Sequence, residues 1–271
     1  MRRRFLRLSA NRRFIADAMR ISARVPTVSV QRRMQLRAVA AARVDCAGRP
    51  SWAALFTKSF ALVADEFPEL RRAYISYPWP HLYEQPENAA MVLIERRYRG
   101  ESAVFPFLIR KPAWLPVVML SEIIRNAKSA PIEAVTDFQL LIRVSSLPRP
   151  LRRLVWWTVL NSGRLRANYC GTFVVSAFSS MGVELLYSIV PGMVLLTPGI
   201  VAADGGVDVR AMWDHRVFDG AVMARALVRM EEVLCTTIVE ELRSSSARSI
   251  DVGPAADAAA QPLPHDPRIS A

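Results

Sequence analysis

The sequence predicts an α/β or α+β fold built as one large domain. Three observations carry this prediction. The chain has 271 residues, of which 52% are hydrophobic, and this is enough for a sizeable core. Segments with helical periodicity are mixed with strand-like segments along the chain. Several strand-like segments are separated only by short turns, which is typical of hairpins within one sheet.

The first part of the chain is predicted to alternate helix and strand. Residues 10–23 have apolar side chains at helical spacing, and residues 24–34 are extended because valines alternate with polar residues after a proline. Residues 51–67 form an amphipathic helix that begins after the N-cap Ser51 and ends before Pro68. The next predicted elements are strands at residues 89–98 and 102–110 and a helix at residues 118–128.

The second part of the chain supplies the other strands and a closing helix. The predicted strands lie within residues 171–178, 193–202 and 207–213. Residues 221–243 form a long helix, because their leucines and isoleucine recur at helical spacing. Residues 244–271 are rich in Ser, Ala and Pro and lack aromatic side chains, so they are predicted to be a disordered tail after a domain at residues 1–243.

Two apolar segments raise the question of membrane contact. Residues 183–203 contain Glu184 and two Pro-Gly pairs, which suit two buried strands joined at a turn better than a spanning helix. Residues 147–166 carry two adjacent tryptophans with basic flanks and predict a short helix. Two interpretations of this helix stay open. It is an interfacial membrane anchor or a lid over an apolar substrate, or it is a surface helix that docks Leu154, Val155 and one tryptophan into the core.

The positive charge is concentrated at the start of the chain. The net charge is +12, and residues 1–43 hold twelve Arg and one Asp, so 12 − 1 = +11 of it lies there. Such a segment is typical of a transit peptide or of an arm that contacts nucleic acid or a membrane surface. We favour a segment of the fold with solvated arginines, because Phe14, Ile15, Ala18 and Met19 lie at helical spacing. A nucleic-acid partner is not expected, because aromatic residues are not interleaved with the arginines.

The cysteines indicate a reducing compartment. Cys46, Cys170 and Cys235 are widely separated, odd in number and without ligand spacing, so neither a structural disulfide nor a metal is expected. No secretory signal peptide is visible, and a cytoplasmic location is the expectation.

The segment WDHRVFDGAV, residues 213–222, holds the strongest candidate for chemistry. A histidine used as a base needs an orienting neighbour, a place for the reacting atom and a donor for the oxyanion. Asp219 follows His215 by four residues and could stabilise the turn through an arginine. The alternative is that His215 is a satisfied core histidine. His81, on a Pro- and Tyr-rich loop, and His265, in the tail, are interpreted as incidental.

Four blocks of sequence resemble a known family. DHRVFDGAVMARAL (214–227) looks like the signature of the acyltransferase catalytic domain of 2-oxo acid dehydrogenase complexes, which shares its fold with chloramphenicol acetyltransferase. RRFIADAMRISARVPTV (12–28), EFPEL (66–70) and GTFVVSAFSSMG (171–182) resemble three further blocks of that domain. The blocks occur in the family's order over residues 5 to 243. The resemblance therefore implies a two-layer α/β sandwich, with a mixed sheet and helices on one side.

The resemblance also implies roles for individual residues. His215 would be the general base that deprotonates a thiol or hydroxyl, and Ser176 would donate a hydrogen bond to the tetrahedral oxyanion. Asp219 would hold the loop and an arginine in place, and Gly220 would permit the tight turn into the last helix. Asp214 and Arg216 match the motif and are assigned to the scaffold. The family works as trimers with the active site in a channel between subunits, uses coenzyme A, and needs neither a metal nor a covalent enzyme intermediate.

The sequence also departs from the family pattern. No lipoyl or subunit-binding domain precedes the first block, so an ordinary core subunit is not expected. The serine motif reads Ser176, Ala177, Phe178, Ser179, and Arg71 replaces the usual asparagine after PEL. The span before Gly171 is longer than usual and contains the Trp-bearing insertion at 147–166.

The sequence thus leads to two hypotheses of different classes. The first is a stand-alone, homotrimeric, CoA-dependent acyltransferase whose substrates are an acyl thioester and a small acceptor, with an apolar acceptor or acyl chain suggested by residues 147–166. The second is a catalytically silent scaffold that docks partners, with peripheral membrane contact through that insertion or through the basic N-terminus. The enzyme requires an open channel, which Trp213 or Phe178 would block in the scaffold.

Overall fold

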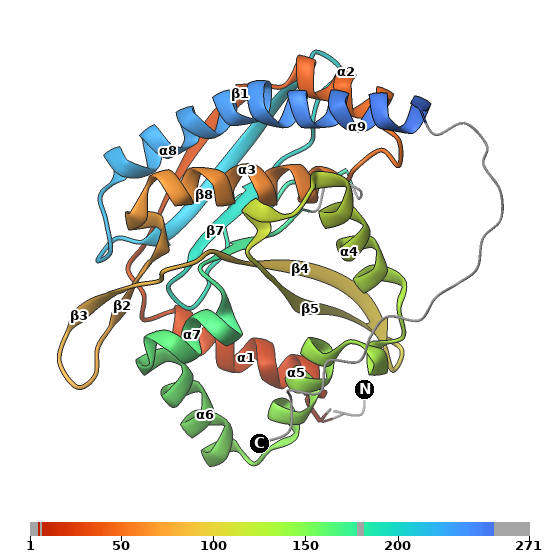
Figure 1. Cartoon of the computed structure of the whole chain (residues 1–271). Coiled ribbons are helices and arrows are strands. Elements are labelled where there is room, and N and C mark those ends of the chain that lie inside the picture. Colours follow the sequence, from red (N-terminus) through yellow and green to blue (C-terminus); the bar gives the residue numbers. More distant parts are fainter. Residues whose placement is uncertain (1–4, 6, 178–181, 252–271) are drawn as a thin grey trace, which may run out of the picture.

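A six-stranded sheet and the helices that pack on it form the body of the protein (Figure 1). The computed structural model describes residues 5, 7–177 and 182–251. The strand order is β1-β8-β7-β6-β4-β5, and β2 and β3 form a separate hairpin that projects from one side. The expectation of a mixed α/β fold is confirmed.

The elements have the following bounds. The strands are β1 (Thr27–Gln35), β2 (Arg72–Ile75), β3 (His81–Glu84), β4 (Ala89–Tyr98), β5 (Glu101–Arg110), β6 (Phe173–Val175), β7 (Val194–Pro198) and β8 (Gly206–Asp214). The α-helices are α1 (Ala10–Ser22), α2 (Arg37–Asp45), α3 (Trp52–Glu66), α4 (Val117–Ser129), α5 (Thr136–Ser146), α6 (Arg149–Asn161), α7 (Gly163–Cys170), α8 (Gly220–Val233) and α9 (Val239–Asp251).

The sheet is mixed because its central strands come from distant parts of the chain. β6 runs parallel to both β4 and β7, whereas β1 with β8, β7 with β8 and β4 with β5 are antiparallel. Leu196 of β7 is paired with Val175 of β6 on one side and with Ala211 of β8 on the other, so these three residues form one row across the sheet. The strands β4 and β5, which the sequence predicts, are joined by a hairpin turn at Arg99 and Gly100, and both residues have positive φ.

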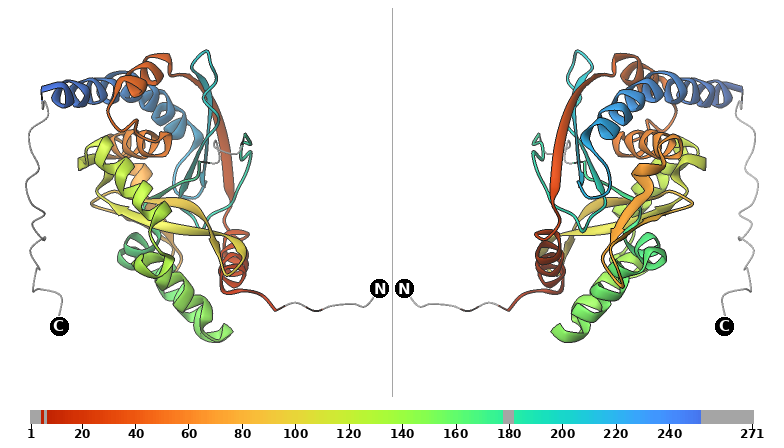
Figure 2. Two further views of the ribbon diagram at one scale, coloured as in Figure 1. Left: turned by 90° about the vertical axis from the view of Figure 1, so that its right-hand side faces the viewer. Right: turned by 90° about the vertical axis from the view of Figure 1, so that its left-hand side faces the viewer.

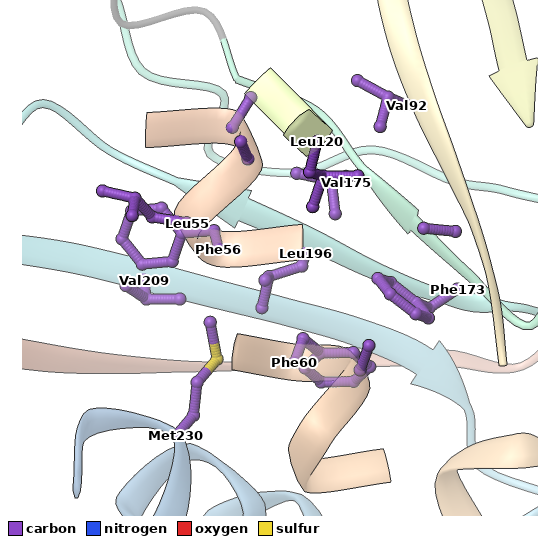
Figure 3. Packing of buried hydrophobic residues seen from close by; sticks show 14 of the residues in the cluster. Leu55, Phe56, Phe60, Val92, Leu120, Phe173, Val175, Leu196, Val209 and Met230 are labelled. Atoms are coloured by element: carbon purple, nitrogen blue, oxygen red, sulfur yellow. The ribbon is translucent and has the colours of Figure 1, made fainter. Parts of the chain in front are cut away.

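The central strands bury side chains on both faces. Phe173 and Val175 join the large core cluster beneath the helices, while Val174 between them points to a smaller cluster on the opposite face. Figure 3 shows Phe60 of α3 against Phe173, with ring centroids 4.8 Å apart. The larger cluster therefore joins the helical layer to the sheet.

The helices form two groups of unequal size. α2, α3, α4, α8 and α9 make the main layer on one face, while α1, α5, α6 and α7 gather at the end of the sheet where β4 and β5 lie (Figures 1 and 2). α5 packs on β5, and Cys170 at the end of α7 joins the smaller cluster on the second face. This second group contains the insertion expected at residues 147–166.

The predicted start of α3 is confirmed, because a side chain caps it, whereas the predicted end of the closing helix is not. The hydroxyl of Ser51 accepts a hydrogen bond from the N–H of Ala54 at 3.3 Å, so α3 begins where the sequence places it. The closing helix is interrupted by a π-helical turn at Leu234–Ile238 and continues beyond residue 243 to Asp251. Residues 252–271 of the expected tail lie outside the described residues.

The expectation of two strands within residues 183–203 is wrong in its first half. Only β7 forms, and residues 183–190 have no regular structure. This stretch is held by the contacts of one side chain and not by backbone hydrogen bonds to a neighbouring strand. Glu184 accepts a hydrogen bond from the Ile200 N–H at 2.9 Å and pairs with Arg210 at 2.9 Å, and these contacts lower the pKa of its carboxyl group. None of the described helices is both long and apolar enough to cross a membrane.

We expect Phe60→Ala to lower the free energy of unfolding by about 3–5 kcal/mol, because it removes a fully buried ring from the joint between helix and sheet. Urea denaturation followed by circular dichroism measures this change. Phe5→Ala is the matched control, because it removes the same atoms from a ring that is 98% exposed. Equal effects of the two substitutions would contradict the assignment of the core.

Candidate active site at the turn after β8

The turn between β8 and α8 is fixed by aromatic stacking. The buried ring of Trp213 stacks on Phe218, with centroids 5.5 Å apart and planes 4° from parallel. Its indole N–H donates to the Phe218 carbonyl at 2.9 Å, and the Val217 N–H donates to the Asp214 carbonyl at 3.0 Å. The residues between these anchors therefore have a defined conformation.

His215 sits on this turn and faces solvent. Its backbone N–H donates to the Pro26 carbonyl at 3.0 Å, which ties the turn to the chain just before β1. The imidazole is 47% exposed, and its Nδ1 lies 3.7 Å from the nearer carboxylate oxygen of Asp219. The alternative of a core histidine is wrong, because the ring is not enclosed by the core. The other ring nitrogen, Nε2, is the one available for proton transfer to a ligand.

Asp214, and not Asp219, holds the arginine of the turn. Two guanidinium nitrogens of Arg216 donate to the buried Asp214 carboxylate at 2.9 and 2.7 Å, and this hydrogen bonding raises the pKa of Arg216. The guanidinium also lies over the ring of Tyr74, 4.0 Å from its centroid. Asp214 thus orients the residue that follows His215.

Arg166 is a buried neighbour that the sequence analysis missed. Its side chain is on α7 and donates to the carbonyls of Tyr74 and Pro191, each at 2.9 Å, and to that of Gly192. Burial lowers its pKa, and the charge of Asp214 opposes this shift. Nothing in the segment SGRLR distinguishes Arg166 from the other arginines, because its role depends on strands that are distant in sequence.

Asp219 and Gly220 do not have the structural roles expected of them. The Asp219 carboxylate is 89% exposed, makes no hydrogen bond that caps α8, and pairs with no arginine among the described residues. Gly220 lacks a positive φ, and a Cβ added there would meet nothing within 4 Å. The stacked Trp213 and Phe218 shape the turn instead, so neither of the two residues is required for it.

Ser176 follows β6 and lies at the wall of an apolar cavity. Its N–H donates to the Leu196 carbonyl at 3.0 Å, and the residue is buried, with 2% exposure. The hydroxyl has no hydrogen-bond partner within the described part of the protein. An unsatisfied buried hydroxyl is unfavourable, so a ligand oxygen at this position would stabilise it.

One chain does not bring Ser176 and His215 together. Ser176 lies one residue beyond the row formed by Val175, Leu196 and Ala211, and His215 lies four residues from that row in the opposite direction. Five residues along the strands and two strands across correspond to roughly 19 Å between their Cα atoms. A site that contains both side chains therefore needs a second copy of the chain.

Other candidate groups are not placed to react. Burial raises the pKa of the Cys170 thiol to about 11, so the thiol stays protonated at neutral pH. Trp213 is held in the core by its stacking and does not project from the turn, whereas Phe178 lies outside the described residues. In the described part of the chain, no cluster of three His, Cys, Asp or Glu side chains could hold a metal ion.

Solved structures of acyltransferase catalytic cores have the same fold. A probable dihydrolipoamide acetyltransferase from Listeria monocytogenes 4b F2365 is 16% identical, with a TM-score of 0.62 over 89% of this chain and 95% of its own. The Azotobacter vinelandii dihydrolipoamide acetyltransferase is also 16% identical, with a TM-score of 0.63 over 88% of this chain and 94% of its own. The cubic core of a pyruvate dehydrogenase multienzyme complex is 16% identical, with a TM-score of 0.64 over 88% of this chain and 94% of its own. No protein-family model and no curated protein matches the sequence.

These matches confirm the fold that the resemblance implies. The chain has the architecture of the dihydrolipoamide acetyltransferase core along nearly its whole described length. At 16% identity the likeness concerns the fold, and the chemistry has to be argued from the residues themselves.

We expect Asp214→Asn to lower the free energy of unfolding by about 3 kcal/mol, because Arg216 and the buried Arg166 lose the carboxylate between them. Asp219→Asn removes the same charge from an exposed side chain and should change stability by less than about 0.5 kcal/mol. Chemical denaturation of both variants measures the difference. Similar losses in the two variants would show that Asp214 does not anchor the turn.

Proposed function

We propose that the protein is a CoA-dependent acyltransferase in which His215 of one copy acts with Ser176 of a second copy. The observation that carries this proposal is that the two candidate groups have complementary surroundings and lie far apart in one chain. One chain offers a solvent-facing imidazole on a rigid turn and, roughly 19 Å away, a buried hydroxyl without a partner. The imidazole can serve as a base and the hydroxyl as a donor to an oxyanion, and a reaction centre needs both groups at one place.

The proposed reaction is a direct transfer. Nε2 of His215 takes the proton from the hydroxyl or thiol of the acceptor, whose oxygen or sulfur attacks the thioester carbonyl. The Ser176 hydroxyl donates a hydrogen bond to the oxyanion of the tetrahedral intermediate. The C–S bond then breaks, and the CoA thiolate receives the proton from the imidazolium. No metal, permanently bound cofactor or covalent enzyme intermediate is needed.

The comparisons support these assignments by residue type and by the order of the residues along the chain. The catalytic mechanism of the Azotobacter enzyme has been studied at a serine, a histidine and an asparagine four positions after that histidine. This chain has Asp219 four positions after His215, and Ser176 precedes His215 in the sequence, directly after strand β6. We propose that Asp219 orients the imidazole through Nδ1, and that the assembly is the homotrimer expected from the resemblance.

We expect His215→Ala and Ser176→Ala each to lower acceptor-dependent thiol release from acyl-CoA by about 100-fold or more. When equal amounts of the two variants are unfolded together and refolded, mixed oligomers should regain about a quarter of the wild-type activity. One in four interfaces then combines an intact histidine with an intact serine.

Asp219→Asn is the control in the same turn and should lose less than about ten-fold, because an amide oxygen can replace the carboxylate as an acceptor beside the imidazole. An inactive mixture made from single variants that both bind acyl-CoA would contradict the shared site. A folded wild-type protein that neither releases thiol from any acyl-CoA nor binds CoA would instead favour the non-catalytic scaffold.

A further inference from the structure

A large apolar cavity lies beneath the second face of the sheet. Its volume is about 560 Å³, within the range of roughly 300–1,000 Å³ that small-molecule sites occupy. The sheet contributes Leu93, α1 contributes Phe14, α5 contributes Leu140, and α6 contributes Trp156 and Val159. The cavity therefore exists because the second helix group covers this end of the sheet.

The few polar groups of the cavity distinguish a ligand site from a packing defect. The carboxylate of Asp137 accepts a hydrogen bond from the Leu108 N–H at 2.9 Å and is satisfied. The hydroxyl of Ser176 has no partner and also lines the cavity. An apolar ligand with one oxygen would meet both requirements, the apolar walls and the unsatisfied donor.

A second pocket adjoins the first and is basic. It has a volume of about 600 Å³ and shares Trp156 and Pro191 with the apolar cavity. Its charged side chains are those of Arg20, Arg24, Arg153, Arg166, Arg216 and Asp214. Asp214, the only carboxylate among its described lining residues, is already bound by Arg216. The pocket therefore has an excess of positive charge.

Three of these arginines are available to an anion. Arg20 and Arg24 on the α1 side and Arg153 on α6 form no ion pair with any described carboxylate, and Asp17 nearby is bound by Arg152 at 2.7 Å. Repulsion from Arg149 and from Arg20 lowers the pKa of Arg153. Crowded guanidinium groups of this kind are stabilised by phosphate, which accepts several charge-assisted hydrogen bonds.

We propose that the two pockets form one site for a long-chain acyl thioester of a phosphorylated carrier, with the acyl chain in the apolar cavity and the phosphate at Arg20, Arg24 and Arg153. This inference rests on the proposed function and adds the class of acyl group to it. The insertion then selects the substrate. Trp156 contacts Phe14, with ring centroids 5.5 Å apart, and lines both the apolar pocket and the basic one.

Isothermal titration calorimetry of the full chain with palmitoyl-CoA, below its micelle concentration, and with acetyl-CoA tests the site. Each buried methylene adds roughly four-fold to affinity, so palmitoyl-CoA should bind at least about 100-fold more tightly. Phosphatidylglycerol vesicles are the third probe. If the protein binds the vesicles and binds palmitoyl-CoA no more tightly than acetyl-CoA, the proposal is overturned in favour of contact with a membrane surface.

Matched variants locate the two parts of the ligand. Val159→Phe fills the cavity and should weaken palmitoyl-CoA by about ten-fold or more while leaving acetyl-CoA unchanged, whereas Leu151→Phe adds a ring at an exposed position of the same helix. Arg153→Glu should weaken both CoA esters, and Arg164→Glu, at an exposed position outside the pocket, should weaken them much less. If Val159→Phe does not fold, Leu140→Trp on α5 fills the cavity from a side chain that is already 40% exposed.

Binding and turnover separate this inference from the proposed function. His215→Ala should bind palmitoyl-CoA as the wild type does. Tight binding of palmitoyl-CoA with no turnover would uphold the site and contradict the acyltransferase. Turnover of acetyl-CoA with equal affinity for both esters, or with no effect of the cavity variants, would uphold the acyltransferase and overturn the site.

Discussion

The structure depends on a sheet whose central strands are apolar on both faces. β6 and β7 are buried along their whole length, so each face needs a cover. The main helical layer covers one face and closes the larger core. On the other face α1 and the group α5 to α7 gather at the end near β4 and β5. The apolar cavity and the unpartnered Ser176 hydroxyl follow from this unequal cover.

Elements with a local signal could be predicted from the sequence. Ser51 caps α3, and the strands β4 and β5 lie on either side of Arg99 and Gly100, because each feature is decided by a few adjacent residues. The stretch before β7 could not be predicted in this way. Glu184 fixes it by pairing with Arg210, on a strand more than twenty residues later, and hydrophobicity carries no information about that contact.

The candidate site shows the same limit more sharply. The motif around His215 identifies the turn, but the sequence analysis gave the arginine to Asp219, whereas Asp214 binds it. Both aspartates flank the histidine, and only burial distinguishes them, at 2% exposure for the Asp214 side chain and 89% for that of Asp219. The separation of Ser176 from His215 depends on strand register, which no local pattern specifies.

The position of α6 has a consequence for how such a protein can diverge. The turn with His215 is carried by β8 and stacked aromatic rings, whereas the cavity wall at Trp156 and Val159 is carried by a helix outside the central sheet. Mutations in α6 can therefore reshape the cavity without passing through intermediates that have lost the turn. In evolutionary terms the two regions are separable modules, and relatives of this chain can exchange ligands while they inherit the same scaffold.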